Sequence, residues 1–105
     1  MGKKEDLIGD LKGFKARIGG MIPVEKMLLF GSQAKGGARR DSDVDLIIIS
    51  KKFKGERFRY RPLGFRKYWT IDHPVDFLCY TPEEFNRLKK QTALVQEAWE
   101  HGIEI

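Results

Sequence analysis

The sequence predicts an α/β (α+β) fold in which a small mixed sheet of three to four strands packs against helices. Two observations predict it. Segments whose apolar residues follow helical spacing alternate with short apolar segments, of which residues 44–49 are dense in β-branched residues. The short segments are apolar at consecutive positions, as in strands that are covered on both faces. Because the chain has 105 residues, we expect residues 1–105 to form a single domain.

The first part of the chain predicts a helix, a strand and a short second helix. Residues 4–18 carry apolar side chains at helical spacing, and the glycine pair at 19–20 ends this helix. Residues 26–30 form an apolar run that indicates a first strand. Residues 32–35 can form a short helix, which the glycine pair at 36–37 would end.

The rest of the chain predicts further strands and one long helix. Residues 44–49 and 75–80 indicate the second and third strands, and residues 58–69 fit a helix entered near Pro62. Thr81 and Pro82 are a typical N-cap and first helical residue, so we expect one helix from residue 82 to about residue 100. The core stripe of that helix and a short fourth strand are expected at Leu88, Leu94, Val95 and Trp99, and at residues 103–105.

Composition indicates the cellular compartment of the protein and reveals one basic stretch. No apolar run could span a membrane, and the single Cys79 is expected to be a buried, reduced thiol, which indicates the cytoplasm. The net charge is +5, and residues 51–67 are rich in Lys and Arg. This stretch could bind nucleic acid, meet an acidic partner surface or lie in solvent with its aromatic residues in the core. For Phe65 and Trp69 the core is the favoured interpretation.

Two aspartates stand at the start of the second strand. Asp43 and Asp45 are two residues apart, so in an extended chain both side chains leave the same face, about 7 Å apart. Burying such a pair costs several kcal/mol unless a cation compensates, and carboxylate oxygens suit Mg²⁺. Asp76, at the start of the third strand, would join them if the two strands are neighbours.

Two other interpretations of these acids remain open. The run from Ser42 to Asp45 resembles a helix capping box, although the Leu-Ile-Ile-Ile that follows favours a strand. Alternatively, Asp43 ends a turn and Asp45 is a solvated edge residue. Nearby His73 could take part in catalysis, but an exposed loop position is favoured.

Gly31 and Ser32 follow the first predicted strand and suggest an anion site. Gly31 would let the backbone approach a ligand, and the Ser32 hydroxyl with free N–H groups at a helix start could bind phosphate. A Gly-Ser pair alone is an ordinary turn. Together with three acids in one small sheet, it indicates metal-assisted phosphoryl chemistry.

The two motifs resemble a known family. Gly-Ser-Gln-Ala-Lys-Gly at 31–36 and Ser-Asp-Val-Asp-Leu at 42–46, followed by Asp76, are similar to the signature of the minimal nucleotidyltransferases. That family belongs to the DNA polymerase β-like nucleotidyltransferase superfamily, and the resemblance covers nearly the whole chain. It implies the nucleotidyltransferase fold, with a small mixed sheet and helices against it.

The resemblance also implies roles for individual residues. Asp43 and Asp45 would bind the catalytic divalent ions, Mg²⁺ or Mn²⁺, and Asp76 would complete the metal site and could act as base toward a hydroxyl. Gly31 and Ser32 would hold the nucleoside triphosphate. Position 33 is Gln where many relatives have Arg, so Lys35, Arg39 or Arg40 is expected to supply charge to the phosphates.

The expected activity is transfer of a nucleoside monophosphate, AMP from ATP, to a hydroxyl acceptor. The chain has no room for an acceptor-binding domain, so the acceptor would come from a second copy or a partner. By resemblance, the partner is a helical HEPN-domain toxin that the chain neutralises as an antitoxin, in some cases by adenylylating a tyrosine. The alternatives are a non-catalytic binding module and a nucleic-acid-binding protein that uses residues 51–67.

Overall fold

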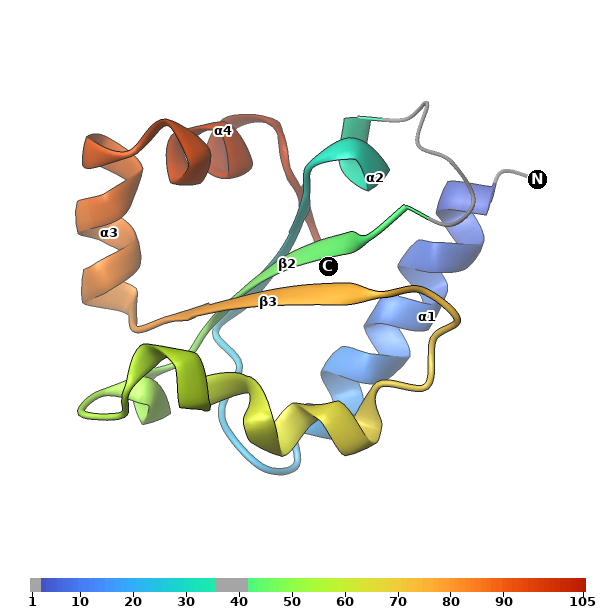
Figure 1. The fold of residues 1–105 in the computed structure, drawn as a ribbon, viewed down its shortest axis with the longest axis horizontal. Coiled ribbons are helices and arrows are strands. Elements are labelled where there is room, and N and C mark those ends of the chain that lie inside the picture. Colours follow the sequence, from blue (N-terminus) through green and yellow to red (C-terminus); the bar gives the residue numbers. More distant parts are fainter. Residues whose placement is uncertain (1–2, 36–41) are drawn as a thin grey trace.

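A four-stranded mixed sheet forms the centre of the computed structural model, which describes residues 3–35 and 42–105. The strand order is β3-β2-β1-β4 (Figure 1). β1 pairs antiparallel with β2 and with β4, whereas β2 and β3 are parallel. The strands are β1 (Lys26–Phe30), β2 (Val44–Ile49), β3 (Val75–Tyr80) and β4 (Ile103–Glu104). The mixed sheet predicted from the sequence is thus confirmed.

Helices cover both faces of the sheet. α1 and η2 pack on one face and α3 and α4 on the other, so the strands separate two hydrophobic cores (Figure 1). The helices are α1 (Lys3–Ile18), α2 (Ser32–Lys35), the 3₁₀ helices η1 (Lys51–Phe53) and η2 (Phe58–Tyr68), α3 (Pro82–Gln91) and α4 (Ala93–His101). None of the described helices is long and apolar enough to cross a membrane.

The alternation of side chains along β2 decides where its acid points. Leu46 and Ile48 enter the core under α1, and Ile47 and Ile49 enter the core under α3 and α4. Because side chains two residues apart share a face, Asp45 lies on the α3–α4 face, beyond the end of that core. Burial on both faces explains the unbroken run of isoleucines.

The core under α1 and η2 contains a cluster of aromatic rings. Phe14 lies 5.0 Å from Trp69 and 5.7 Å from Phe77 between ring centroids, and Phe65 lies 6.0 Å from Phe77. Phe65 is 2% exposed and Trp69 packs against the same core. The prediction that these two aromatic residues of the basic region serve the core is therefore confirmed.

The prediction of one helix from residue 82 to about residue 100 is wrong. The structure has two helices, with Thr92 in an extended conformation (φ −122°, ψ 138°) between them. Thr92 ends α3 by donating its N–H to the carbonyl of Leu88, and its hydroxyl accepts from the N–H of Val95 to begin α4. A β-branched hydroxyl residue that can cap a helix favours such a break.

The break also corrects the predicted core stripe. Val95 is buried as predicted, and Leu88 packs at the edge of the core. Leu94 and Trp99 were predicted in the core, but they are 52% and 44% exposed. In a single helix Leu88, Val95 and Trp99 would have shared one face, with Leu94 about 120° away around the axis. The break at Thr92 instead lets α4 begin with a new orientation.

An internal ion pair anchors η2 to the rest of the fold. Arg61 is 8% exposed and donates to both carboxylate oxygens of Glu84, at 2.6 and 3.2 Å, and to the carbonyl of Cys79 at 3.0 Å. Glu84 also completes the capping box of α3 with Thr81, which confirms the predicted helix start. Cys79 is buried as predicted, and burial raises the pKa of its thiol to about 12.

Candidate active site

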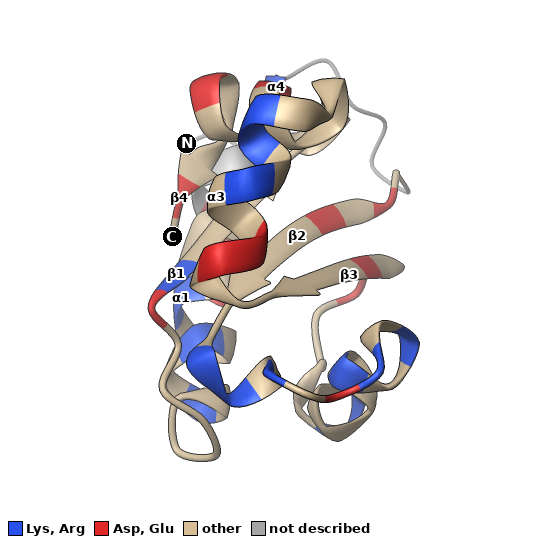
Figure 2. Cartoon of the chain, turned by 90° about the vertical axis from the view of Figure 1, so that its left-hand side faces the viewer, with Lys and Arg blue, Asp and Glu red and all other residues tan. Residues whose placement is uncertain are grey.

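Two of the predicted acids lie side by side on the sheet. Asp45 on β2 and Asp76 on β3 are Cα partners in the parallel register, so both side chains leave the same face of neighbouring strands, which run about 4.8 Å apart. Figure 2 shows acidic residues on β2 and β3 near the same end of the two strands. Asp43 precedes β2 by one residue and is exposed. The parallel register of β2 and β3 thus places Asp76 beside Asp45, as expected if the two strands are neighbours.

The charges of these acids act on one another. Burial raises the pKa of the Asp45 carboxyl above its usual range, and the negative charges of Asp76 and Asp43 raise it further. Within the described part of the chain, no Lys, Arg or His forms an ion pair with any of the three carboxylates. This end of the sheet therefore concentrates negative charge that the described residues do not neutralise.

The donor type at this end of the sheet fits a hard divalent ion. Carboxylate oxygens are the ligands that Mg²⁺ and Mn²⁺ prefer. Among the described residues, no three His, Cys, Asp or Glu side chains are grouped so that they could hold a metal ion as they stand. Holding one would require the carboxylates to turn toward a common point, and the exposed side chains of Asp43 and Asp76 have room to do so.

Gly31 is required beside the acids. It has φ +75°, and a Cβ atom at this position would overlap Oδ2 of Asp45. A side chain here would thus be strained and would push the Asp45 carboxylate aside. The carbonyl of Gly31 accepts from the N–H groups of Ala34 and Lys35, both at 3.1 Å, which forms α2. Ser32 follows directly and is exposed at the start of that short helix.

Two side chains contact the backbone just before Asp43, and the sequence did not indicate either contact. Gln33 donates from Nε2 to the carbonyl of Ser42 at 3.0 Å, and Nδ1 of His73 lies 3.3 Å from the same oxygen. His73 is half-buried rather than exposed, and its carbonyl accepts from the indole of Trp69 at 2.8 Å. The sequence could not predict that Gln33 and His73 meet, because their common partner is a backbone carbonyl, which every residue has.

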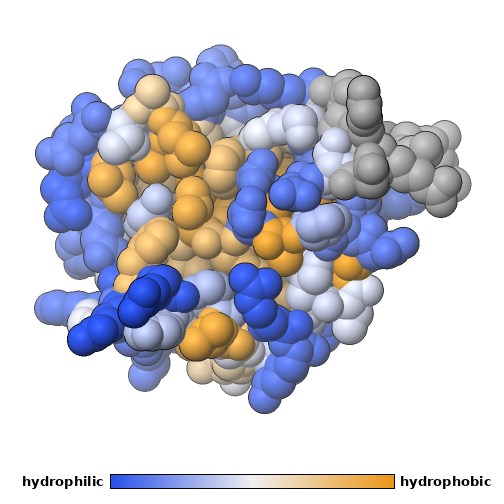
Figure 3. Space-filling view, in the orientation of Figure 1, coloured by the Kyte–Doolittle hydropathy of each residue, from blue (hydrophilic) through white to orange (hydrophobic). Residues whose placement is uncertain are grey.

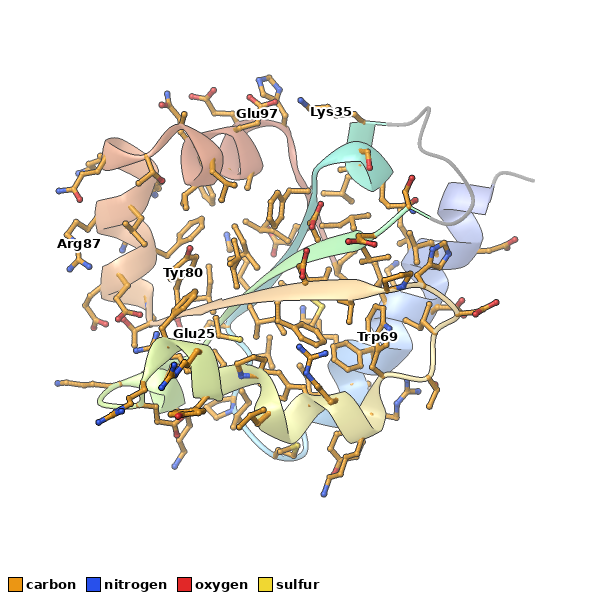
Figure 4. All side chains as sticks on the ribbon, in the orientation of Figure 1. Glu25, Lys35, Trp69, Tyr80, Arg87 and Glu97 are labelled. Atoms are coloured by element: carbon orange, nitrogen blue, oxygen red, sulfur yellow. The ribbon has the colours of Figure 1, made fainter. Side chains whose placement is uncertain are left out.

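Of the cations predicted to bind phosphate, Lys35 is described by the structure and forms an ion pair. Lys35 pairs with Glu97 of α4 at 2.9 Å, with both side chains exposed, and they point toward each other in Figure 4. Such a surface pair is weak, so Lys35 could exchange Glu97 for a phosphate. Arg39 and Arg40 lie outside the described residues, and their predicted contacts with phosphate stay predictions.

Comparison with known proteins identifies the family. Residues 11–94 match the family described as “Nucleotidyltransferase domain”. The chain belongs to the nucleotidyltransferase domain family. It is therefore a transferase enzyme, and a nucleotidyltransferase uses a nucleoside triphosphate as substrate.

Two relatives agree with this assignment of the nucleotidyltransferase. The chain is 22% identical over 102 residues to a protein of Methanocaldococcus jannaschii named “Putative protein adenylyltransferase”, and the match covers 95% of this chain and 99% of that protein. The fold is similar to a crystal structure described as “a putative nucleotidyltransferase from Sulfolobus solfataricus”. The TM-score is 0.68 with 20% sequence identity, covering 96% of this chain and 80% of that one.

Proposed function

We propose that this nucleotidyltransferase transfers AMP from ATP to a hydroxyl group of a protein, with Asp43, Asp45 and Asp76 as the acids of its active site. The observation that carries the proposal is the register of β2 and β3. It pairs Asp45 with Asp76 on one face, next to the glycine turn at Gly31.

The three carboxylates would hold Mg²⁺ or Mn²⁺. The bound ion would neutralise the charge of the triphosphate and draw electrons from its α-phosphoryl group. The raised pKa of Asp45 supports this assignment, because clustered carboxylates that no described cation neutralises favour a cation in the site.

The glycine turn would position the phosphates. With no side chain at Gly31, the backbone can approach the triphosphate closely, and the Ser32 hydroxyl can donate a hydrogen bond to a phosphate oxygen. Lys35, released from Glu97, and Arg39 would add positive charge to this cradle. Each of these contacts would be stronger away from bulk water.

The transfer step would use Asp76 as the general base. The acceptor oxygen attacks the α-phosphorus, the bond from that phosphorus to the oxygen bridging to the β-phosphate breaks, and pyrophosphate leaves. The proton of the acceptor hydroxyl passes to Asp76. β3 is an edge strand and Asp76 is exposed, so an acceptor as large as a protein side chain can reach it.

The sheet face beside the acids would seat the nucleoside. Figure 3 shows apolar side chains gathered on the face over β2, β3, α3 and α4. Phe30 and Leu78 are half-buried at the margin of that core and share a face with Asp45 and Asp76. A flat apolar surface of this kind suits a nucleobase, because a base loses little by leaving water on its faces.

The acceptor would be supplied by another chain. By resemblance to stand-alone minimal nucleotidyltransferases, we propose a tyrosine of a helical HEPN-domain toxin, so that transfer neutralises the toxin and the chain acts as an antitoxin. The relative named as a protein adenylyltransferase supports a protein acceptor. The acceptor could also be a hydroxyl of a second copy of the chain, so the test must detect label on the chain itself.

Transfer of label tests this function. ATP labelled at its α-phosphate is mixed with Mg²⁺, the chain and a HEPN-domain protein, and labelled protein is measured. We expect label on the HEPN-domain protein with the wild type. Asp45→Asn, which removes a charge but keeps the shape, should lower the rate at least about 100-fold.

Asp72→Asn is the matched control. Asp72 is an exposed acid in the loop before β3, and its loss should leave the rate unchanged within about twofold. Label on the chain itself would point to a second copy as acceptor. Equal transfer by wild type and Asp45→Asn would contradict the proposed site, and full neutralisation of the toxin by Asp45→Asn would show that binding alone suffices.

A further inference from the structure

A cavity of about 220 Å³ lies at the end of the sheet opposite the acids. Ile49 forms part of its wall and is the Cα partner of Lys26 on β1 and of Tyr80 on β3. Ile49 lies four residues beyond Asp45, which is about 13 Å along a strand. Ile47, Val95 and the residues packed with them fill the sheet face in between. The cavity is therefore separate from the candidate active site.

One part of the cavity wall is apolar and aromatic. Pro82 and Phe85 of α3 line it together with Ile49 and with Trp99 of α4. The rings of Phe85 and Trp99 meet edge to face, with centroids 5.8 Å apart. Trp99 remains 44% exposed, so a large part of a big aromatic surface is open to a ligand. Such a surface favours a planar, apolar binding partner.

Two ammonium groups lie over the exposed indole. Nζ of Lys89 is 4.3 Å and Nζ of Lys26 is 4.8 Å from the centroid of the Trp99 ring. Lys26 also pairs with exposed Glu104 at 3.5 Å, which is a weak contact in water. Both cations line the cavity, so a ligand there meets an aromatic plane and positive charge together.

We propose that this cavity binds a nucleotide unit, with its base stacked on Trp99 and its phosphate paired with Lys26 and Lys89. As the base enters, an ammonium group leaves the ring face and reaches the phosphate at the cavity mouth. The volume is smaller than the roughly 300–1,000 Å³ of drug-sized sites, so it suits one nucleotide with its phosphate outside.

The polar groups of the cavity agree with this ligand. The amide of Asn86 and the carboxylate of Glu25 also line it and can pair with the edge of a base. Among the described residues that line the cavity, Lys26 and Lys89 are basic and Glu25 is acidic, and the exposed pair of Glu25 with Lys51, at 4.0 Å, is weak in water. The surplus of positive charge disfavours a cationic ligand, and the aromatic walls disfavour phosphate alone.

The nucleotide unit could come from two sources. It could be a free mononucleotide, or one unit of a single RNA strand that continues over Lys51, whose ammonium group lies 4.0 Å from the Glu25 carboxylate of the cavity. In single-strand binding, a base stacks on an aromatic residue while lysines follow the backbone, and affinity falls with salt. The experiment must therefore present both forms.

Nuclear magnetic resonance of the indole N–H groups provides the test. The chain has two tryptophans, and Trp69 donates its indole N–H to the carbonyl of His73, so it is an internal reference. AMP, adenosine, inorganic phosphate and an oligoadenylate of about six nucleotides are titrated in EDTA, which removes divalent ions. We expect a saturable shift of the Trp99 signal by AMP or the oligonucleotide below about 5 mM, with Trp69 unmoved.

Matched variants locate the site. Lys89→Gln and Lys26→Gln together should weaken binding at least about tenfold, because both phosphate partners are lost. Lys90→Gln, an exposed neighbour on α3, should bind as the wild type does. Asp45→Asn should also leave the Trp99 shift unchanged, so failure of the proposed transferase site would not affect this result.

The outcomes distinguish the sources and can overturn the proposal. Tighter binding of the oligonucleotide, with a steep salt dependence, would assign the site to RNA, and equal or tighter binding of AMP would assign it to a free nucleotide. Phosphate alone binding as well as AMP, no saturable Trp99 shift with either ligand, or unchanged binding after loss of both lysines would contradict the proposal.

Discussion

Two carboxylates at opposite ends of the parallel strand pair have opposite surroundings. Glu84 lies past the end of β3 and is paired with Arg61, whose hydrogen bond is the main cause of its lowered pKa. Asp45 lies at the start of β2 beside two other acids, and its pKa is raised by burial and by their charges. The protein thus neutralises one carboxylate internally and clusters the other with like charges.

This difference distinguishes a carboxylate that stabilises the fold from one that we propose to be functional. The Arg61–Glu84 pair holds η2 and the start of α3 together. The acids around Asp45 repel one another in the folded chain, which costs stability unless a ligand brings positive charge. A cost of this kind is expected where a protein binds a cation and phosphates.

The largest expected effect is on the structural side of this comparison. Arg61→Ala should destabilise the protein by roughly 3 kcal/mol, because Glu84 loses its cationic partner and the Cys79 carbonyl loses the guanidinium donor. Denaturant unfolding measures this effect. Arg59→Ala, an exposed arginine on the same helix, should change stability by less than about 0.5 kcal/mol. Equal effects of the two changes would mean that the pair does not anchor η2.

A medium effect is expected at the glycine turn. Gly31→Ala should cost about 1–2 kcal/mol of stability and lower transfer at least about tenfold, because the new Cβ displaces the Asp45 carboxylate. Gly55→Ala is a close control, since Gly55 has φ +81° but nothing within 4 Å of an added Cβ. It should cost about 1 kcal/mol and leave transfer unchanged. Loss of transfer in both variants would argue for a general effect of backbone strain.

The smallest effect is a difference in pH dependence. A raised pKa in the fold destabilises the ionised form, so Asp45→Asn should stabilise the metal-free protein by about 0.5 kcal/mol at neutral pH. This gain should disappear as the pH falls below the ordinary value of 3.8. A lowered pKa has the opposite effect on stability. Glu84→Gln should therefore destabilise the protein at pH values above the ordinary value of 4.5, and this loss of stability should shrink as the pH falls below that value.

Urea unfolding at several pH values measures how the change in unfolding free energy caused by each substitution depends on pH. The opposite pKa shifts of Asp45 and Glu84 predict that the two changes in unfolding free energy have opposite signs at neutral pH and that both decrease toward zero in acid. Changes of the same sign at neutral pH would show that Asp45 is neutralised by something other than a bound cation.

The sequence predicted what local patterns encode. The strands at 26–30, 44–49 and 75–80 lie in short apolar runs that are followed by Gly31, Ser50 and Thr81, and burial on both faces explains why these runs are apolar at consecutive positions. The helix break at Thr92 was missed because the apolar periodicity of residues 82–100 continues through it. Only the side-chain cap of α4 and its packing on the sheet decide that position.

In the candidate site, too, some features follow from local sequence motifs and others only from the tertiary structure. Asp43, Asp45, Asp76, Gly31 and Ser32 form motifs whose spacing carries chemical meaning, so the sequence could name them. The convergence of Gln33 and His73 on the carbonyl of Ser42, and the pairing of Lys35 with Glu97, join distant segments through the folded structure. No spacing in the chain records such contacts, and only the tertiary arrangement shows them.

The most direct test of the central claim is binding of Mn²⁺, followed by electron paramagnetic resonance in the presence of a non-hydrolysable ATP analogue. If the clustered acids exist to hold a divalent ion, the wild type should bind Mn²⁺ saturably, and Asp45→Asn should weaken this binding more than about tenfold. Asp72→Asn should bind as the wild type does. Equal Mn²⁺ affinity in wild type and Asp45→Asn would contradict the account, because the repulsion among Asp43, Asp45 and Asp76 would then have no ligand to relieve it.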